Sequence, residues 1–134
     1  MGVLKVETTL LQSSDDIVRV RQTVRAWAIE LGFGLVDQTK IVTAASELAR
    51  NTVIYGGGGH IKYESLLEGA RRGLRLTFED QGPGIPNLEL ALTDGYTTGG
   101  GLGLGLSGAR RLSNEFSIES SPGNGTRVTI TRWK

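Results

Sequence analysis

A glycine-rich run at residues 99–105 is the segment of this sequence whose composition most directly predicts chemistry. Five of its seven residues are glycine, in the order Gly-Gly-Gly-Leu-Gly-Leu-Gly. Glycine reaches positive φ without steric cost and leaves backbone N–H groups uncovered, so consecutive amides can form a concave anion-binding surface. The run therefore predicts a phosphate cradle, although a flexible loop or hinge would have the same composition.

The two most familiar phosphate-binding loops do not account for this run. Residues 103–108 match the pattern G-x-G-x-x-G, but the preceding segment 92–96 is a poor strand, and too little chain follows to build a doubly wound domain. No Gly-Lys-Ser or Gly-Lys-Thr occurs anywhere in the chain, which excludes a Walker A loop. Any bound nucleotide must be held by a different arrangement.

Glu47 and Asn51 form a second candidate pair. They are four residues apart in a predicted helix, so their side chains lie one above the other, away from its apolar face. Asn51 offers a neutral carbonyl oxygen to Mg²⁺, and Glu47 could accept a hydroxyl proton or orient a metal-bound water. A solvated surface charge is the alternative for Glu47, whereas Asn is a mediocre helix former and is harder to explain inside a long helix.

An acidic residue next to two glycines follows a predicted strand, in the segment Asp80-Gln81-Gly82-Pro83-Gly84. A carboxylate at a strand end can accept a hydrogen bond from an exocyclic amine, and the glycines would let a flat ring lie against bare backbone. An ordinary Asp-Gly turn is the alternative. Near the C-terminus, residues 123–126 are explained completely as an Asn-Gly hairpin turn, which leaves a second role open for Thr126.

Hydrophobic periodicity predicts the elements that must position these residues. Apolar residues at helical spacing and a Ser13–Asp16 capping box predict a first helix that ends near Leu31. The order β-α-α-β-β-α-α-β-β indicates an α+β fold with its helices on one face of a largely antiparallel sheet. The predicted elements are a strand at 3–11, helices at 13–31 and about 36–54, strands at 61–66 and 74–79 joined by a turn at 69–73, helices at 88–92 and about 104–113, and strands at 116–120 and 127–133.

Composition limits the classes of protein that this chain can represent. Its 134 residues suit a single domain spanning 1–134, and 15 basic against 14 acidic side chains leave no single-sign field for nucleic acid. The chain has no cysteine and one histidine, which argues against a thiolate or histidine metal cluster and is compatible with the cytoplasm. Its apolar runs are short and interrupted by charge, so we expect neither a membrane span nor membrane binding.

Taken together, the four segments resemble the ATP-binding boxes of the GHKL superfamily, which includes gyrase-type ATPases, Hsp90-class chaperones, histidine kinases and MutL proteins. The resemblance covers nearly the whole chain. It implies the Bergerat fold, a two-layer α/β sandwich with helices on one face of a mostly antiparallel mixed sheet. Glu47 to Asn51 resembles the N box, Asp80 to Gly84 the D-x-G-x-G box, the glycine run the ATP lid, and Gly123 to Thr126 the G-x-G-T box.

The resemblance also implies roles for individual residues. Asp80 would bind the adenine amine with a water shared with Thr126, Asn51 would hold Mg²⁺, and Glu47 would be the catalytic base. The lid amides would face the phosphates of ATP or ADP. The implied nucleotide-binding residues are Asn51, Asp80, Gly82, Gly84, Gly99, Gly100, Gly101, Leu102, Gly103, Leu104, Gly105 and Thr126.

Within the superfamily, the N box, the Asp80–Pro86 segment and the short lid are most similar to the switch-protein serine/threonine kinases of bacterial stress signalling. That resemblance implies a substrate serine or threonine on a STAS-domain protein of a stressosome, with a downstream regulatory protein as a further partner. Anti-sigma kinases of similar size usually carry His where Tyr55 stands, so Tyr55 favours the switch kinase. A nucleotide-gated module that sequesters a sigma factor is the alternative, and an ATPase that only hydrolyses is a third possibility, disfavoured by the size of the chain.

Overall fold

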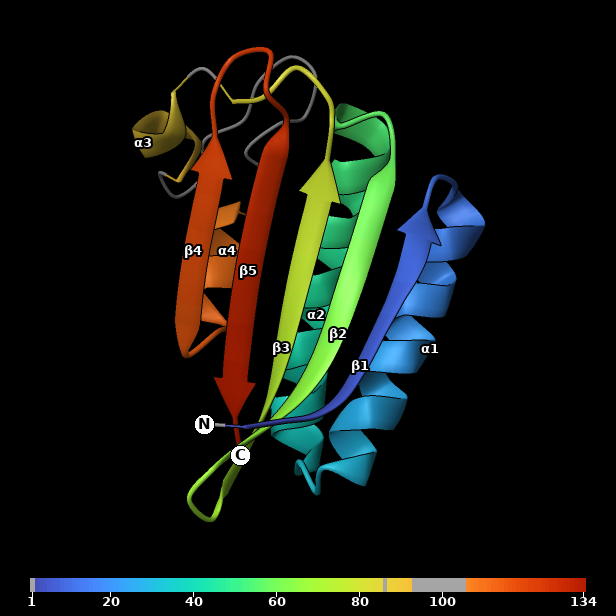
Figure 1. The fold of residues 1–134 in the computed structure, drawn as a ribbon, viewed down its shortest axis with the longest axis vertical. Coiled ribbons are helices and arrows are strands. Elements are labelled where there is room, and N and C mark those ends of the chain that lie inside the picture. The colour runs from blue at the N-terminus through green and yellow to red at the C-terminus, as the bar shows by residue number, and fades with distance from the viewer. Residues whose placement is uncertain (1, 86, 93–105) are drawn as a thin grey trace.

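A five-stranded sheet with helices on one face forms the frame of the molecule (Figure 1). The computed structural model describes residues 2–85, 87–92 and 106–134. The strands lie in the order β1-β2-β3-β5-β4, and all four pairings are antiparallel, so the predicted α+β architecture is confirmed and no described pairing is parallel. The strands are β1 (Gly2–Leu11), β2 (Gly59–Glu68), β3 (Arg71–Asp80), β4 (Glu115–Ser120) and β5 (Thr126–Trp133).

The described helices are α1 (Ser14–Glu30), α2 (Leu35–Arg50), α3 (Leu88–Ala91) and α4 (Leu106–Arg111). The carboxylate of Asp16 accepts the backbone N–H of Ser13 at 3.1 Å, which marks the predicted start of α1. The predicted helix at 36–54 changes form before its end. From Asn51 the chain instead makes a π-helical turn, η1 (Asn51–Tyr55). The helix predicted from about 104 is described only from Leu106.

The core lies between the sheet and the helices α1, α2 and α4. Alternation along β3 turns Leu74, Leu76 and Phe78 toward the helices, where all three are at most 2% exposed. Ile41, Ala45 and Leu48 of α2 meet them from the other side, as the helical spacing predicts. This packing fixes α2 over the middle of the sheet, and it brings η1 to the end where β3 finishes (Figure 1).

The hairpin between β2 and β3 differs from its prediction. The turn contains only Gly69 and Ala70, and residues 71–73, predicted as part of the turn, belong to β3. Gly69 has a φ of +61°, which allows the tight reversal. Gly73 needs no turn conformation. Its glycine identity makes room for the ring of Trp133, which would lie 2.8 Å or less from a Cβ at that position.

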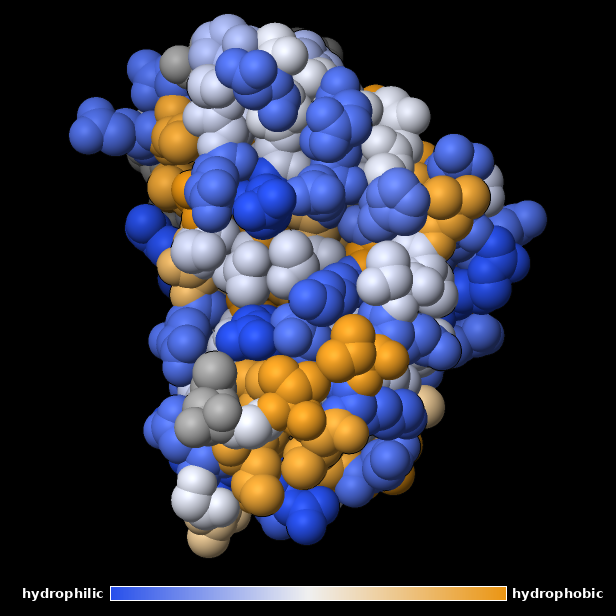
Figure 2. All heavy atoms as spheres, in the orientation of Figure 1, coloured by the Kyte–Doolittle hydropathy of each residue, from blue (hydrophilic) through white to orange (hydrophobic). Residues whose placement is uncertain are grey.

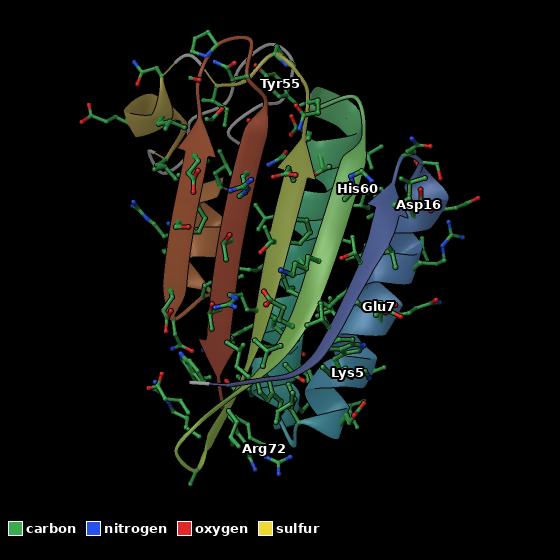
Figure 3. All side chains as sticks on the ribbon, viewed as in Figure 1. Lys5, Glu7, Asp16, Tyr55, His60 and Arg72 are labelled. Atoms are coloured by element: carbon green, nitrogen blue, oxygen red, sulfur yellow. The ribbon has the colours of Figure 1, made fainter. Side chains whose placement is uncertain are left out.

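The outermost strand, β1, is attached to the molecule differently from the others. Nine of its ten residues are exposed, including Val3, Leu4 and Val6. On the helix side, the Lys5 ammonium lies 4.2 Å from the centre of the Trp27 ring, and the hydroxyl of Thr9 lies 3.3 Å from that of Tyr63 (Figure 3). Backbone pairing to β2, these two contacts, an ion pair between Lys5 and Glu30 at 3.3 Å and the fully buried side chain of Leu11 hold β1 in place.

Candidate nucleotide-binding site

Three strands end beside one another at the end of the sheet that η1 reaches. Asp80 closes β3, Thr126 opens β5 and Ser120 closes β4, and the pairing register places Thr126 opposite both of the others. All three follow the alternation of the core-facing residues of their strands, so their side chains point to the helix side. Sequence reasoning placed Asp80 and Thr126 in one site, and the structure brings them together.

A small cavity of about 20 Å³ lies between this row and the helix side. Its walls are largely apolar, and Asp80 supplies the one carboxylate among the lining residues. Asn51 also lines it, so three of the predicted site residues converge there. The lining residues are Leu48, Asn51, Thr52, Tyr55, Phe78, Asp80, Ile85, Leu106, Thr126 and Val128.

The Asp80 carboxylate is held in an environment that disfavours its charge. The residue is 7% exposed, and burial raises the pKa of its carboxyl above the ordinary value. Hydrogen bonds from the backbone of Gly82 and Thr126 act in the opposite direction, and the Gly82 N–H donates to Oδ1 over 2.9 Å. A buried acceptor in an apolar pocket is suited to a ligand that brings its own hydrogen-bond donor.

The glycines around Asp80 allow backbone segments to approach one another closely. A Cβ on Gly56 would overlap the Asp80 carboxyl group, and one on Gly82 would lie 2.7 Å from the carbonyl oxygen of Gly56. Gly84 has a φ of +76°, and a Cβ there would overlap the carbonyl oxygen of Ser121. The fold itself therefore requires Gly82 and Gly84, and their predicted contact with a bound ring stays a prediction.

Glu47 and Asn51 lie one helical turn apart at the junction of α2 and η1. The backbone N–H of Asn51 donates to the carbonyl of Glu47, and both side chains are partly exposed. Asn51 lines the cavity with Asp80, whereas Glu47 does not belong to its wall. The structure therefore joins Asn51 to the pocket and leaves Glu47 one turn earlier on the helix, outside it.

The predicted lid residues Gly99, Gly100, Gly101, Leu102, Gly103, Leu104 and Gly105 lie outside the described residues. Beyond them, the Leu106 side chain at the start of α4 is 2% exposed and forms part of the cavity wall. The described part of the chain thus contains the residues predicted to bind the base, whereas those predicted to form the lid fall outside it.

Two contacts at the site were not predicted from the sequence. The Tyr55 hydroxyl donates to the carbonyl oxygen of Gly84 over 2.9 Å, which ties η1 to the segment after β3 (Figure 3). Ser120 accepts the N–H of Ile85 at 2.8 Å, so the same peptide unit, Gly84–Ile85, is held at both ends. Tyr55 lies four residues after Asn51 and Ser120 keeps the alternation of β4. The sequence therefore indicates which face of its element each residue occupies, but not that both hydroxyl groups reach the Gly84–Ile85 peptide.

The chemistry of the described lining residues suits the base of a nucleotide, with apolar walls for a purine ring and the Asp80 carboxylate for an exocyclic amine. At about 20 Å³ the cavity has room for roughly one water, so its walls would have to move apart to admit a ring. For Mg²⁺, Asn51 offers one amide oxygen, and the described residues contain no group of three or more His, Cys, Asp or Glu side chains that could hold a metal. A magnesium ion here would therefore need most of its ligands from phosphates and water, as is usual in phosphoryl-transfer sites.

Comparison with known proteins agrees with this geometry. Residues 36–134 match the model of the family described as histidine kinase-, DNA gyrase B- and HSP90-like ATPases. The chain is 50% identical over 118 residues to the serine/threonine-protein kinase RsbT of Bacillus subtilis, covering 88% of this chain and 89% of the relative. It is 32% identical over 136 residues to an anti-sigma F factor of Bacillus licheniformis, covering 96% and 90%.

The fold also matches a solved structure. A crystal structure of the RsbU and RsbW domains of a Mycobacterium tuberculosis protein superposes with a TM-score of 0.62 over 98% of this chain, at 22% identity. The present chain spans about a third of that longer one. Among the described residues, no helix is long and apolar enough to cross a membrane.

Proposed function

Since the chain belongs to the family of histidine kinase-, DNA gyrase B- and HSP90-like ATPases, we propose that it transfers a phosphoryl group from Mg-ATP to a serine or threonine of a STAS-domain partner. The GHKL resemblance of its sequence motifs is thereby confirmed. The enzyme is a serine/threonine-protein kinase. The proposal concerns its substrate, the setting in which it works and the role of each residue.

The observation that carries the proposal is the Asp80 pocket. A carboxylate that is 7% exposed shares an apolar cavity with Asn51 and Thr126, although these residues come from different parts of the sequence. Maintaining a buried charge costs folding free energy, and such groups concentrate at binding sites. The similarity to a serine/threonine-protein kinase over 88% of the chain supports the same use of this pocket.

Each residue of the site has a distinct task in the proposal. Asp80 accepts the exocyclic amine of adenine, Thr126 lies beside it, and Asn51 supplies an oxygen to the metal. Bound Mg-ATP supplies the phosphoryl group, and the lid glycines 99–105 contribute backbone N–H groups to its phosphates. Glycines in that segment would also permit the lid to close around the nucleotide.

Glu47 acts as the base in this proposal. Its carboxylate would take the hydroxyl proton of the incoming serine or threonine as the hydroxyl oxygen bonds to the γ-phosphorus of ATP. The bond from that phosphorus to the bridging oxygen would break, and ADP would leave. The side chain is partly exposed and stands outside the base-binding cavity, on the same helix as Asn51 and one turn away. A partner protein could reach it there while the nucleotide base stays enclosed.

The proposed setting is a bacterial partner switch in the cytoplasm. The single 1–134 domain would phosphorylate a STAS-domain protein of a stressosome, with a downstream regulatory protein as a further partner. The similarity to RsbT supports this setting, since the alignment covers most of this chain and most of that relative.

The second candidate function is a nucleotide-gated module that binds and sequesters a sigma factor. The 32% identity to an anti-sigma F factor over 96% of the chain favours it. Tyr55 favours the kinase, because it stands where the anti-sigma kinases usually carry His. A pure binder has no need of a base at Glu47.

Phosphate transfer to STAS-domain candidates separates the two functions. The protein is incubated with Mg-ATP and each candidate, and mass spectrometry locates the phosphate. We expect phosphorylation by the wild type and a loss of about 10²- to 10⁴-fold in rate for Glu47→Gln, with ATP binding retained. Glu68→Gln, an exposed carboxylate at the far end of β2, is the matched control. A tight complex without any phosphate transfer would favour the sequestering module.

A further inference from the structure

The hydroxyl groups that line the base-binding cavity all direct their hydrogens into the protein. Thr52 donates to the carbonyl of Leu48 over 3.0 Å, and Tyr55 donates to the carbonyl of Gly84 over 2.9 Å. The third hydroxyl belongs to Thr126, whose Oγ1 lies 2.8 Å from the hydroxyl oxygen of Ser120. The direction of that last hydrogen bond decides what Thr126 presents to a ligand.

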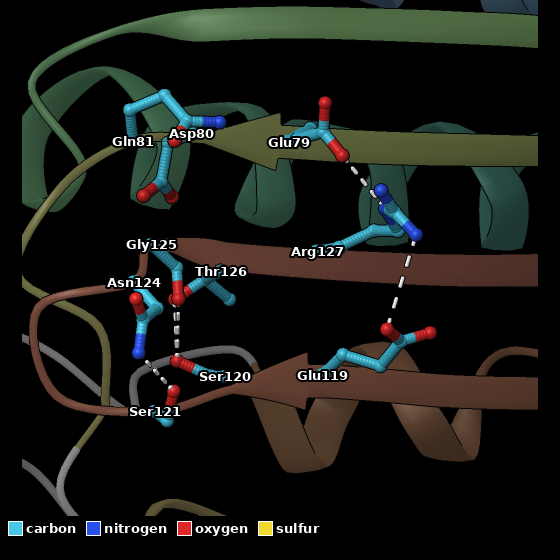
Figure 4. A pocket seen from close by; sticks show the side chains of 10 residues that line it. All are labelled: Glu79, Asp80, Gln81, Glu119, Ser120, Ser121, Asn124, Gly125, Thr126 and Arg127. Carbon is cyan, nitrogen blue, oxygen red and sulfur yellow. Dashed lines mark hydrogen bonds and ion pairs between the residues drawn. The ribbon is translucent and has the colours of Figure 1, made fainter.

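Ser120 determines this direction, because a serine hydroxyl has one hydrogen and two lone pairs. It donates its hydrogen to the carbonyl oxygen of Gly125 over 2.9 Å (Figure 4). It accepts the N–H of Ile85 over 2.8 Å. The remaining contact can only be a hydrogen bond if Thr126 is the donor. Every buried side-chain polar atom of the described residues has a hydrogen-bond partner, which agrees with a fully used Ser120 hydroxyl.

With its hydrogen committed to Ser120, Thr126 turns only lone pairs toward the cavity. The Asp80 carboxylate beside it is also an acceptor when ionised. Asn51 is the cavity residue whose side chain also carries donor hydrogens, and it belongs to η1 rather than to the strand row. The strand side of the pocket therefore offers hydrogen-bond acceptors from two neighbouring side chains.

We propose that Ser120, which does not line this cavity, is a positioning residue that makes the site specific for a 6-amino purine over a 6-oxo purine. The inference rests on the proposed nucleotide-binding function and deepens it. An amino group donates to the acceptor row, whereas a 6-oxo group would face lone pairs and lose its own hydrogen bonds on entering the pocket. Adenine and hypoxanthine nucleotides differ in this respect.

The test compares the binding of ATP and inosine triphosphate by calorimetry, in the presence of Mg²⁺. We expect the wild type to prefer ATP by about 100-fold. In Ser120→Ala the Thr126 hydroxyl is free to turn and donate, so the preference falls by about tenfold, through weaker ATP binding and relatively stronger binding of inosine triphosphate. Ser120→Thr retains a hydroxyl and is expected to restore the preference, and Ser117→Ala, an exposed residue of the same strand, leaves it unchanged.

Circular dichroism and thermal unfolding show whether each variant is folded. If Ser120→Ala does not fold, Thr126→Val tests the same hydrogen bond from its other partner. Thr126→Val removes the hydroxyl that accepts from the ligand, so it should also reduce the preference for ATP over inosine triphosphate. If both variants lowered the affinities for ATP and for inosine triphosphate by the same factor, the inference would be overturned. The hydroxyls of Ser120 and Thr126 would then have a purely structural role. Equal affinities of the wild type for ATP and inosine triphosphate would overturn the inference as well. A wild type that binds neither nucleotide would instead contradict the proposed function.

Discussion

Two rows of polar residues cross the same three strands, one residue apart, and they behave in opposite ways. The inner row, Asp80–Thr126–Ser120, faces the helices and is held by hydrogen bonds. The outer row, Glu79–Arg127–Glu119, faces away from them (Figure 4). Its side chains are 40%, 52% and 74% exposed, and Arg127 pairs with the two carboxylates at 2.7 and 3.8 Å.

The difference shows that burial, rather than residue type, determines what a polar side chain contributes. Water competes for the outer row, and Figure 2 shows the same uncovered face as largely hydrophilic over this end of the sheet. The inner row has lost that water, so each donor and acceptor must find a protein partner or a ligand. We therefore expect changes in the inner row to alter stability and binding strongly, and changes in the outer row to have little effect.

The largest effect is expected where the backbone itself packs against the inner row. Gly125 has a φ of +75°, and a Cβ there would overlap the backbone carbonyl of Asp80. Gly125→Ala should lower the free energy of unfolding by about 3 kcal/mol or more in chemical denaturation. Gly123→Ala is the control, because Gly123 lies in the same hairpin at a φ of +80° with no atom near its missing Cβ. Equal losses in the two variants would show that the close approach to Asp80 does not matter.

Asp80→Asn comes next and should change binding and stability in opposite directions. The amide offers donors where the pocket needs an acceptor, so ATP affinity should fall by about 100-fold or more in calorimetry. The raised pKa of Asp80 means that its contribution to stability is lost as pH rises from the ordinary carboxyl pKa through the folded value. The nucleotide-free variant should therefore unfold at a higher temperature than the wild type at pH 7.

The neighbouring outer-row residue is the control for this change. Glu79→Gln should leave ATP affinity and the unfolding temperature close to those of the wild type, because Glu79 is 40% exposed. Normal ATP affinity in Asp80→Asn would remove the assignment of Asp80 to the adenine amine.

An ion pair on the outer face with a buried carboxylate and a partly exposed guanidinium tests whether burial, rather than the face of the sheet, determines the effect of a substitution. Glu64 is 6% exposed and accepts two hydrogen bonds from the Arg75 guanidinium, at 2.9 and 3.0 Å. Arg75→Met should lower the free energy of unfolding by about 2 kcal/mol at pH 7, since the buried Glu64 carboxylate loses the charge and the two hydrogen bonds of the guanidinium. Lys62→Met is the control, because Lys62 is exposed and lies 3.8 Å from the same carboxylate.

The pH dependence of that pair has a defined sign. Hydrogen bonds from Arg75 hold the pKa of Glu64 below its ordinary value. The stabilisation is therefore complete above the ordinary glutamate pKa, and it disappears as pH falls through the lower folded value. The difference between the wild type and Arg75→Met should shrink on acidification, and a difference independent of pH would show that the loss comes from packing alone.

The smallest effect is expected for Arg127→Met in the outer row. Its ion pairs are exposed to solvent and screened by salt, so the midpoint of thermal unfolding should move by about 2 °C or less. The measurement is made at low and high salt, and any difference should vanish at high salt. A loss as large as that of Arg75→Met would contradict the distinction between the rows.

The sequence was sufficient to predict those parts of the site that depend on local periodicity. The alternating strand predicted at 74–79 places Asp80 at a strand end, and helical spacing places Asn51 one turn after Glu47. Both placements follow from the repeat of a single element, and the structure confirms them. The overall α+β fold follows in the same way from the order of the elements.

The contacts that sequence reasoning missed join elements far apart in the chain. The hydrogen bond from Tyr55 to Gly84 spans 29 residues, and that from Ile85 to Ser120 spans 35. Local patterns carry no information about such partners. The π-helical turn was also missed, because hydrophobic spacing and helix propensity do not distinguish a π-helical turn from the end of an α-helix.

The position of β1 at the edge of the sheet gives one of the two tryptophans of the chain a use as a fluorescent reporter. Trp27 is 5% exposed beneath β1 and the Lys5 ammonium, whereas Trp133 lies against Gly73 in the pair formed by β3 and β5. Opening that releases the edge strand would hydrate the Trp27 indole. In a Trp133→Phe protein, where Trp27 is the single tryptophan, fluorescence would therefore follow the release of β1.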